Sequence, residues 1–209
     1  MATDSVGSKF KPGVQYGPVL SQTDLYLLKA ELELNPILTS SAPNFNLIFN
    51  ISSGHTTGIN PAGPQDRDLG FTTKDEFATV PRVTRLILIT RLSPWCTIVD
   101  NENGVTLKDI CEAIWKDYSE NYITDAEFSA INPRVQEAVK RTAMSRQAAN
   151  SQANAWYGAY TPAQPPSRFK RYDWLRDKIF FDRLHKQDDY ALQRLGFKAP
   201  NIFVMDFVS

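Results

Sequence analysis

The chain lacks the short motifs that most often identify a nucleotide or metal site. Neither Gly-x-x-x-x-Gly-Lys nor Gly-x-Gly-x-x-Gly occurs in its 209 residues, so the usual phosphate-binding loops are missing. It has only two histidines, His55 and His185, and two cysteines, Cys96 and Cys111. Neither histidine has a second His or a Cys at the spacing of a zinc ligand pair. We therefore expect no metal and no nucleotide as cofactor.

Long hydrophobic runs are also missing. The longest apolar block, Leu86–Ile89, is far shorter than the ~18 residues that a membrane span requires. The start, Met1-Ala-Thr-Asp-Ser, has neither the basic nor the apolar part of a secretory signal. We therefore expect a soluble, cytoplasmic protein without a membrane partner, in which Cys96 and Cys111 are reduced and buried.

An excess of either charge is absent, since 23 basic and 23 acidic residues balance. Their distribution is uneven: residues 101–132 carry two basic and seven acidic side chains, and residues 133–209 carry 13 and seven. A basic C-terminal third can bind nucleic acid through phosphates, but Asp188 and Asp189 are among the acidic residues interleaved with its bases. A solvated face or acid-to-base self-association explains the asymmetry better, and we expect a homodimer.

Hydrophobic periodicity predicts separate groups of helices and strands. The clearest helix spans 107–118, where Leu107, Ile110 and Ile114 lie on one apolar stripe behind a capping box that begins at Thr106. Further helices are expected near 22–33, at 124–131 and from 133, and strands at 45–51, 83–90, 95–99, 169–175, 178–184 and 201–208.

This segregated order favours an α+β fold with a mostly antiparallel sheet of about five to six strands and roughly three to four helices packed on one face. We expect an irregular N-terminal arm over 1–20 and a single α+β domain over 21–209. Loop insertions are expected near 52–79, which is rich in Gly, Pro, Thr and Asp, and near 147–167.

Candidate catalytic residues are few. His55 lies in a polar, glycine-rich segment, Ser52-Ser-Gly-His-Thr-Thr-Gly58, where it can serve as a base beside a serine. An exposed turn explains the same position, and neighbouring carboxylates such as Asp188 and Asp189 point apart in an extended chain. We therefore expect a protein that is not an enzyme, with a hydrolase that uses His55 as an alternative.

Three aromatic side chains, Trp156, Tyr157 and Tyr160, fall in a proline-flanked segment where no helical or strand periodicity explains them. They can close a flat hydrophobic pocket, form a patch that binds a protein partner, or only pack the loop. The residues alone leave these alternatives open.

Several segments follow one another in a characteristic order. They are Leu34-Asn-Pro-Ile-Leu38, Pro94-Trp-Cys-Thr-Ile-Val, Gly104-Val-Thr-Leu-Lys-Asp-Ile-Cys-Glu-Ala-Ile-Trp, Ile123-Thr-Asp-Ala-Glu-Phe and Tyr172-Asp-Trp-Leu. Together, over about residues 34–184, they resemble a domain family of mushroom-forming (basidiomycete) fungi that has no assigned function. The chain departs from that pattern at Arg176-Asp-Lys, where the family usually has glycines, and in its more aromatic insertion at 147–167.

The resemblance implies a small-molecule binding protein. A functionally described relative is a chromoprotein that holds an indole-type pigment non-covalently, so the resemblance implies pigment binding, although it carries over no contact residue. A planar apolar ligand needs aromatic walls and one or two hydrogen-bond donors. The candidate ligand-binding residues are Trp95, Trp156, Tyr157, Tyr160 and Trp174 as walls, and His55 and Tyr172 as donors. A protein-interaction module without a ligand is a further alternative.

Overall fold

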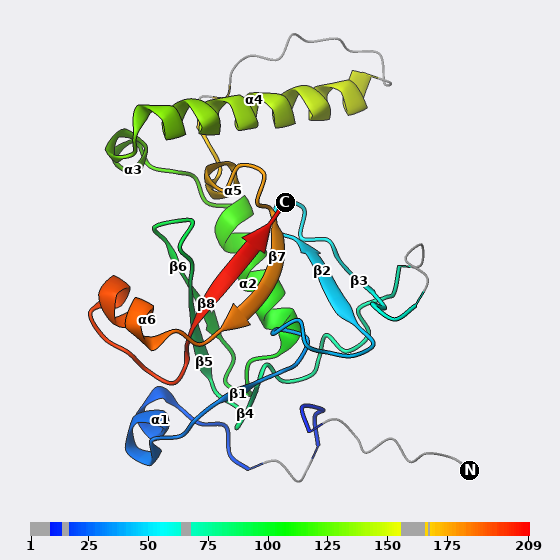
Figure 1. Ribbon diagram of the computed structural model, residues 1–209, viewed down its shortest axis with the longest axis vertical. Coiled ribbons are helices and arrows are strands. Elements are labelled where there is room, and N and C mark those ends of the chain that lie inside the picture. The colour runs from blue at the N-terminus through cyan, green and yellow to red at the C-terminus, as the bar shows by residue number, and fades with distance from the viewer. Residues whose placement is uncertain (1–8, 14–16, 64–67, 156–165, 167) are drawn as a thin grey trace.

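A computed structural model describes residues 9–13, 17–63, 68–155, 166 and 168–209 (Figure 1). In this part of the chain, six helices and eight strands form a six-stranded sheet, a two-stranded sheet and the layers around them. In chain order the elements are α1 (Gln22–Leu28), β1 (Glu33–Leu34), β2 (Asn46–Asn50), β3 (Thr56–Ile59), β4 (Thr79–Val80), β5 (Arg85–Ile89), β6 (Cys96–Asp100), α2 (Leu107–Ser119), α3 (Asp125–Ala130), α4 (Pro133–Ala155), α5 (Arg171–Trp174), β7 (Phe180–His185), α6 (Asp188–Leu195) and β8 (Ile202–Val208).

The six-stranded sheet has the order β3-β2-β7-β8-β5-β6. All of its neighbouring strands are antiparallel except β5 and β8, which run parallel with Ile87 opposite Ile202. Strands β1 and β4 form the separate antiparallel pair. The predicted α+β fold with a mostly antiparallel sheet is therefore confirmed.

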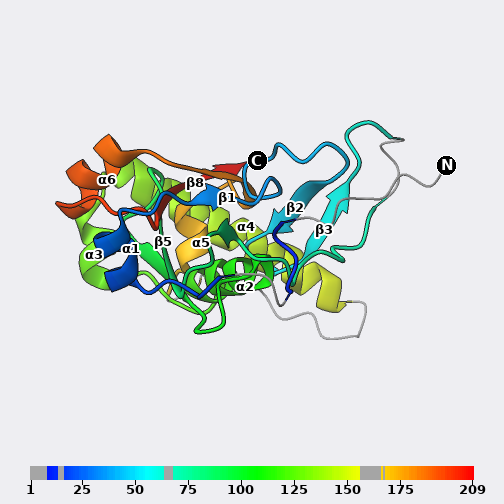
Figure 2. The same cartoon turned by 90° about the horizontal axis from the view of Figure 1, so that it is seen from below.

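Helices cover both faces of this sheet, not one face as the sequence predicted, and Figure 2 shows α2 and α6 on opposite sides of it. The larger core lies under α2, where Leu107, Ile110 and Ile114 are buried. A smaller core lies under α6, whose Ala191 packs with the sheet residue Ile89 and its neighbours. Helix α6 has no counterpart among the elements expected from the sequence, because these eight residues bury so few side chains that no apolar stripe marks the helix.

Capping groups start the helices that the sequence predicted most clearly. The Thr106 hydroxyl accepts a hydrogen bond from the Asp109 backbone N–H at 3.2 Å, and the Asp109 carboxylate accepts from the Thr106 N–H at 2.9 Å. Thr124 and Glu127 form the same reciprocal pair at α3. Each pair satisfies N–H groups that have no partner inside the helix, which fixes where the helix begins.

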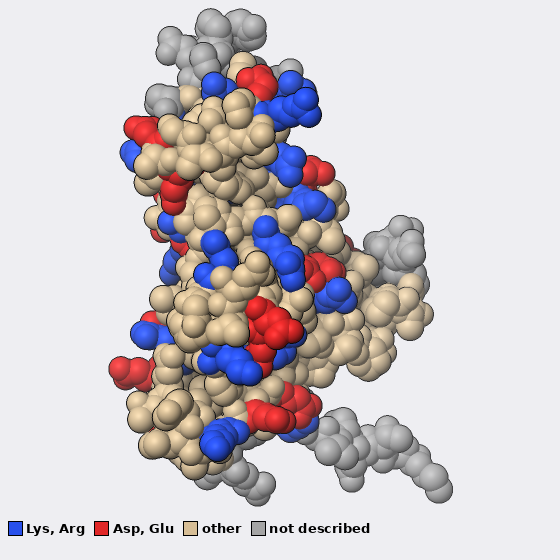
Figure 3. Space-filling view, turned by 60° about the vertical axis from the view of Figure 1, so that its left-hand side comes forward, with Lys and Arg blue, Asp and Glu red and all other residues tan. Residues whose placement is uncertain are grey.

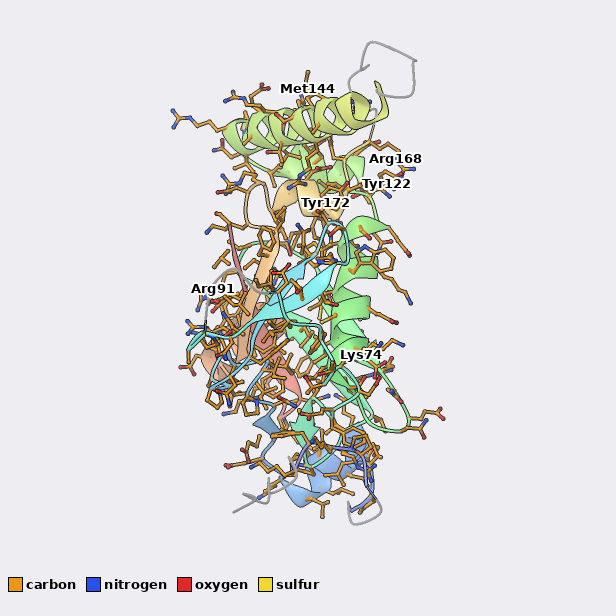
Figure 4. The ribbon with its side chains drawn as sticks, turned by 90° about the vertical axis from the view of Figure 1, so that its right-hand side faces the viewer. Lys74, Arg91, Tyr122, Met144, Arg168 and Tyr172 are labelled. Carbon is orange, nitrogen blue, oxygen red and sulfur yellow. The ribbon has the colours of Figure 1, made fainter. Side chains whose placement is uncertain are left out.

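The long helix α4 lies across one end of the molecule, beyond the sheet (Figure 1). It buries only a narrow strip, including Val139 and Ala143, and its main contact is with α5. Figure 4 shows Tyr172 of α5 directly below α4, so α5 connects this end of the molecule to the sheet. In the described part of the chain, no helix is both long and apolar enough to cross a bilayer.

Four predicted segments differ from the structure. The loop insertion expected near 147–167 is helical over residues 147–155, which belong to α4, and residues 156–165 and 167 lie outside the described part of the chain. The strand predicted at 169–175 is wrong: residues 171–174 form α5, because the Asp173 carboxylate accepts from the Lys170 N–H at 2.9 Å and closes a helical turn. The helix predicted near 22–33 ends at Leu28, since Lys29 takes a left-handed conformation with φ of 50°. The expected loop at 52–79 contains β3 and β4, whose four and two residues are too few for a clear alternation.

Candidate functional site

Two of the predicted aromatic walls meet at one end of the sheet. The ring of Trp95, just before β6, lies edge-on to the ring of Trp174 in α5, with centroids 5.1 Å apart and 64° between the planes. Tyr118 of α2 adds an edge contact to Trp95 at 6.0 Å, and Phe207 of β8 packs on Tyr118 at 5.8 Å. We call these four rings the aromatic cluster; they link the start of β6 to α2, α5 and β8.

The polar groups of the aromatic cluster already have partners within the protein. The Trp95 Nε1–H donates to the Glu127 carboxylate at 2.6 Å, and the Trp174 Nε1–H donates to the Leu92 carbonyl at 3.0 Å. The Tyr118 hydroxyl is 2.7 Å from the Ser93 hydroxyl. The donors that a planar guest would use are therefore engaged, and the two tryptophans act as packing residues.

An ion pair closes the solvent side of the aromatic cluster. The Arg171 guanidinium lies 4.7 Å from the ring centroid of Trp95 and forms an ion pair with Asp117. The second Asp117 oxygen accepts from the Thr97 hydroxyl at 2.7 Å. Burial opposes ionisation of Glu127, but hydrogen bonds from Thr124 and Trp95 outweigh it and lower its pKa. The cluster is thus sealed by charges that are themselves paired.

Tyr172, the predicted donor, occupies a second layer between α4 and the aromatic cluster. The Arg146 guanidinium of α4 lies 4.7 Å from its ring centroid and donates to Asp173 at 2.9 Å. Burial and the neighbouring Asp173 charge raise the pKa of Tyr172. Burial likewise raises the pKa of Asp173, against the hydrogen bonds it accepts. These contacts fasten α4 to α5.

His55, the other predicted donor, is exposed in the turn between β2 and β3 and is not part of the aromatic cluster. The nearby serines do not present hydroxyls to its ring: Ser52 donates to the Asn50 side chain at 2.7 Å, and Ser53 accepts from the His55 backbone N–H at 3.2 Å. The geometry therefore contains no serine–histidine pair at this turn. Trp156, Tyr157 and Tyr160 lie outside the described residues.

The structure reveals a groove that the sequence analysis missed. It has a volume of about 700 Å³ and lies between α1 and the chain that flanks α6. On the α1 side, Leu25 is buried in the core, while the next two side chains are turned outward: Tyr26 is 82% exposed and Leu27 is 69% exposed. Large apolar side chains this exposed at a groove are typical of a binding surface.

Hydrogen bonds of Lys186 brace the opposite wall of the groove. The Lys186 ammonium donates to the carbonyls of Pro200 and Ile202 at 3.2 and 3.1 Å and pairs with Asp188 at 3.1 Å. Burial lowers the pKa of Lys186. Its bonds hold Ala199 and Pro200 in place as an apolar surface facing α1. Two exposed ammonium groups, of Lys29 and Lys198, complete the rim.

The sequence held one usable signal for this groove. A seven-residue helix can bury only one narrow stripe, yet Leu25, Tyr26, Leu27 and Leu28 are four consecutive apolar residues. Most of them must therefore face solvent or a ligand. The other wall comes from residues more than 150 positions later in the chain, and no sequence pattern brings the two together.

The cysteines and acidic residues of the described part of the chain show no metal centre. No group of three or more His, Cys, Asp or Glu side chains comes together there. Cys111 is buried in α2, and burial raises its pKa to about 12. Cys96 is exposed on β6, so the expectation that both thiols are buried is wrong for Cys96, because it falls on the solvent-facing side of an edge strand.

Comparison with protein-family models matches residues 47–190 to a family of unknown function, DUF6699. The match spans more than half of the chain and overlaps most of residues 34–184, over which the family resemblance extends. The predicted membership of a domain family without an assigned function is thus confirmed. No curated protein and no solved structure matches the chain.

Proposed function

Because the chain belongs to the DUF6699 family, whose function is unknown, we propose a function from the geometry of its surface. The protein binds a small apolar molecule that carries a negative charge, and it holds this molecule in the groove between α1 and the 198–200 turn. The binding is not catalytic. We call this feature the α1 groove.

The exposure of Tyr26 and Leu27 carries the proposal. A soluble protein gains free energy by burying such side chains, and a ligand that covers them supplies that gain, at about 25 cal/mol per Å² of apolar surface. The volume of about 700 Å³ falls within the range of about 300–1,000 Å³ that is typical of small-molecule sites. The wall at Ala199 and Pro200 provides the second surface against which a flat molecule can lie.

Charge defines the ligand class further. Within the α1 groove, Lys186 and Asp188 pair with each other at 3.1 Å. The other charged residues that line the groove are two lysines, Lys29 and Lys198, and one carboxylate, Glu31, so positive charge is in excess. An anionic group on an otherwise apolar molecule matches this excess of positive charge at the rim, where solvent still hydrates the charge.

The family resemblance suggests a more specific ligand. The chain resembles a group that includes the pink chromoprotein of the oyster mushroom, which holds an indole-type pigment non-covalently. An indole-type chromophore is flat and apolar, so it can stack on the Tyr26 ring in the α1 groove. A visible absorption band in the purified protein, lost with a small molecule on denaturation, supports this finer proposal; colourless protein argues against it.

A fluorescence titration tests the proposal. The probe 8-anilinonaphthalene-1-sulfonate is flat, apolar and anionic, and its emission rises when it leaves water. We expect saturable binding to the wild type and at least about tenfold weaker binding to a Tyr26→Ser, Leu27→Ser double variant. The matched control is Leu192→Ser, because Leu192 is 51% exposed on α6 but does not line the groove. Equal binding by wild type, double variant and control would contradict the proposal.

A protein-interaction module is the second candidate. It is favoured by Leu28, which is 65% exposed beside Tyr26 and Leu27 but lies outside the groove lining, so the apolar surface of α1 extends beyond what a small ligand covers. If the small probe fails to saturate and Leu28→Ser alone abolishes capture of a protein partner, this second function replaces the first.

A further inference from the structure

Strand β6 is the last strand of the six-stranded sheet and pairs with a neighbour, β5, on one side only. The Asn101 N–H donates to the Thr84 carbonyl at 2.9 Å, which fixes the phase of the ladder between β5 and β6. In an antiparallel ladder, alternate residues direct their N–H and C=O groups outward. Cys96, Ile98 and Asp100 therefore present three N–H and three C=O groups away from the sheet.

The opposite edge of the same sheet is closed by the chain itself. At β3, the Gly58 N–H donates to the Leu69 carbonyl at 2.9 Å, and the Leu69 N–H donates back at 2.8 Å. No corresponding bridge covers β6 among the described residues. Natural proteins usually cover or distort such an edge. Strand β6 pairs with β5 over five residues without a bulge, so its outer edge is available for pairing with another strand.

A groove runs along this free edge. It has a volume of about 640 Å³, and one side is formed by all five residues of β6. The other side is one face of α2, with Asp109, Glu112, Ala113, Lys116 and Asp117, followed by the C-cap residue Glu120 and by Asn121. Five strand residues and twelve helix residues span similar lengths, about 17 and 18 Å, so the two walls match along the groove. We call this feature the β6 groove.

The β6 groove is acidic. Its lining contains five carboxylates and one ammonium group, that of Lys116. Asp100 and Asp117 are each paired with an arginine. Glu112 is held more loosely, 3.6 and 3.9 Å from Lys108 and Lys116, and Glu120 is exposed at the end of α2. Glu112 and Glu120 are therefore the carboxylates that can bind a cation from outside.

The spacing of these two carboxylates matches an extended peptide. Eight helix residues separate Glu112 from Glu120 by about 12 Å. In a strand, side chains four residues apart share a face and lie about 13 Å apart. On the other face of β6, Ile98 is 54% exposed and offers an apolar contact to the intervening side chains.

We propose that β6 accepts an extended segment of a partner protein as a seventh strand, with alternating basic and apolar side chains. The outward N–H and C=O groups of Cys96, Ile98 and Asp100 pair with the backbone of this segment. Its basic side chains lie over α2 against Glu112 and Glu120, and its apolar side chains lie beside Ile98. This interaction is independent of ligand binding in the α1 groove, which lies on other elements.

Charge distinguishes this partner from a second copy of the chain. Pairing two β6 strands edge to edge would bring two acidic grooves together, each with its Glu112 and Glu120 carboxylates. Like charges placed opposite each other destabilise a strand pair. A basic peptide removes this repulsion.

The test uses a synthetic peptide, acetyl-Lys-Val-Lys-Val-Lys-Val-Lys-amide. Amide hydrogen exchange of the full chain is measured with and without this peptide. We expect saturable binding that slows exchange at the outward N–H groups of Ile98 and Asp100. Exchange at Thr97 and Val99 should not change, because their N–H groups already point to β5. The same peptide methylated on all backbone nitrogens keeps its charge but cannot donate, and it should bind at least about fivefold more weakly.

Variants of the protein provide the matched controls. Ile98→Pro removes one outward N–H without removing a bond to β5 and should weaken binding at least about fivefold, whereas Ile98→Thr keeps the N–H and should bind more tightly than Ile98→Pro. Glu120→Lys should weaken binding, and Glu102→Lys, an equal change outside the groove, should have a smaller effect. If Ile98→Pro fails to fold, the comparison of the two peptides still decides.

Three outcomes overturn the proposal. In the first, the methylated peptide binds as tightly as the unmethylated one. In the second, the amides protected by the peptide lie away from β6. In the third, sedimentation shows a dimer in which the Ile98 and Asp100 amides are already protected without peptide. The last result would assign the edge to a second copy of the chain.

Discussion

The Trp95 indole Nε1–H donates to the Glu127 carboxylate over 2.6 Å, and this bond joins the start of β6 to the first turn of α3. The same carboxylate accepts from the Thr124 N–H at 2.8 Å as part of the α3 capping box. One side chain therefore both begins a helix and fixes the orientation of a buried ring. The aromatic cluster around Trp95 is held from outside as well as by its own packing.

Truncating Trp95 should strongly destabilise the fold. Trp95 is 7% exposed and contacts Trp174 and Tyr118, so Trp95→Ala should lower the free energy of unfolding by about 3–5 kcal/mol. Trp95→Phe retains a ring but not the donor, and should cost about 1–2 kcal/mol. Urea denaturation followed by circular dichroism measures both values. The control is Phe197→Ala, which removes an exposed ring and should change the free energy of unfolding by less than about 0.5 kcal/mol. An equally small effect of Trp95→Ala would contradict the packing role of Trp95.

The charge on Glu127 should contribute to stability only above acidic pH. Its pKa is lowered in the folded protein, so the contribution is fully present above the ordinary glutamate pKa of about 4.3 and is lost as pH falls through the folded pKa. Glu127→Gln has no charge and keeps one acceptor oxygen, so it can accept from Trp95 or from Thr124 but not from both. The difference in unfolding free energy between wild type and this variant should be largest at neutral pH and should shrink on acidification. A pH-independent difference would assign the effect to geometry instead.

Gly58 should tolerate no side chain. A Cβ placed there would lie 2.1 Å from the Phe45 ring, which in turn stacks on Phe71 with centroids 5.6 Å apart. Gly58→Ala should therefore destabilise the protein by about 1–3 kcal/mol. Gly70→Ala is the matched control, because a Cβ at Gly70 meets nothing within 4 Å, and it should leave thermal unfolding nearly unchanged. Equal melting temperatures for the two variants would show that Phe45 moves away freely.

The two cysteines should differ in reactivity. Cys111 is buried, and its pKa of about 12 leaves almost no thiolate at mildly alkaline pH. Burial and the charge of Asp117 also raise the pKa of Cys96, yet this side chain is accessible on β6. Iodoacetamide should therefore label Cys96 slowly and Cys111 only after unfolding, as peptide mass spectrometry can measure. Labelling of Cys111 in the native protein at the same rate would mean that α2 opens readily.

The sequence predicted the elements whose local signals are complete. The α2 stripe of Leu107, Ile110 and Ile114 behind Thr106 specifies a helix, its start and its buried face without any tertiary contact. The run at β5 specifies a central strand because side chains on both of its faces are buried. Periodicity and capping are local properties, so a single sequence contains them.

The segments that were missed depend on distant contacts. Tyr172 and Trp174 read as an alternating strand, but Asp173 closes a helical turn on Lys170. Distant groups then hold this turn, because Arg146 of α4 donates to Asp173 and the Trp174 indole N–H donates to the Leu92 carbonyl. The candidate ligand-binding residues likewise depend on contacts that the sequence alone does not show. The sequence selected Trp95 and Trp174 as candidate ligand walls, but only the fold shows that their indole donors are already occupied.

The location of bound probe tests the central claim, that the α1 groove is the binding site, most directly. We propose two-dimensional NMR of the labelled chain with increasing 8-anilinonaphthalene-1-sulfonate, following the backbone signals and the tryptophan indole N–H signals. Binding in the α1 groove predicts saturable shifts at Tyr26, Leu27, Lys198 and Ala199, with the indole signals of Trp95 and Trp174 unchanged. Shifts centred on those two indoles, with α1 unaffected, would contradict the claim and return the site to the aromatic cluster.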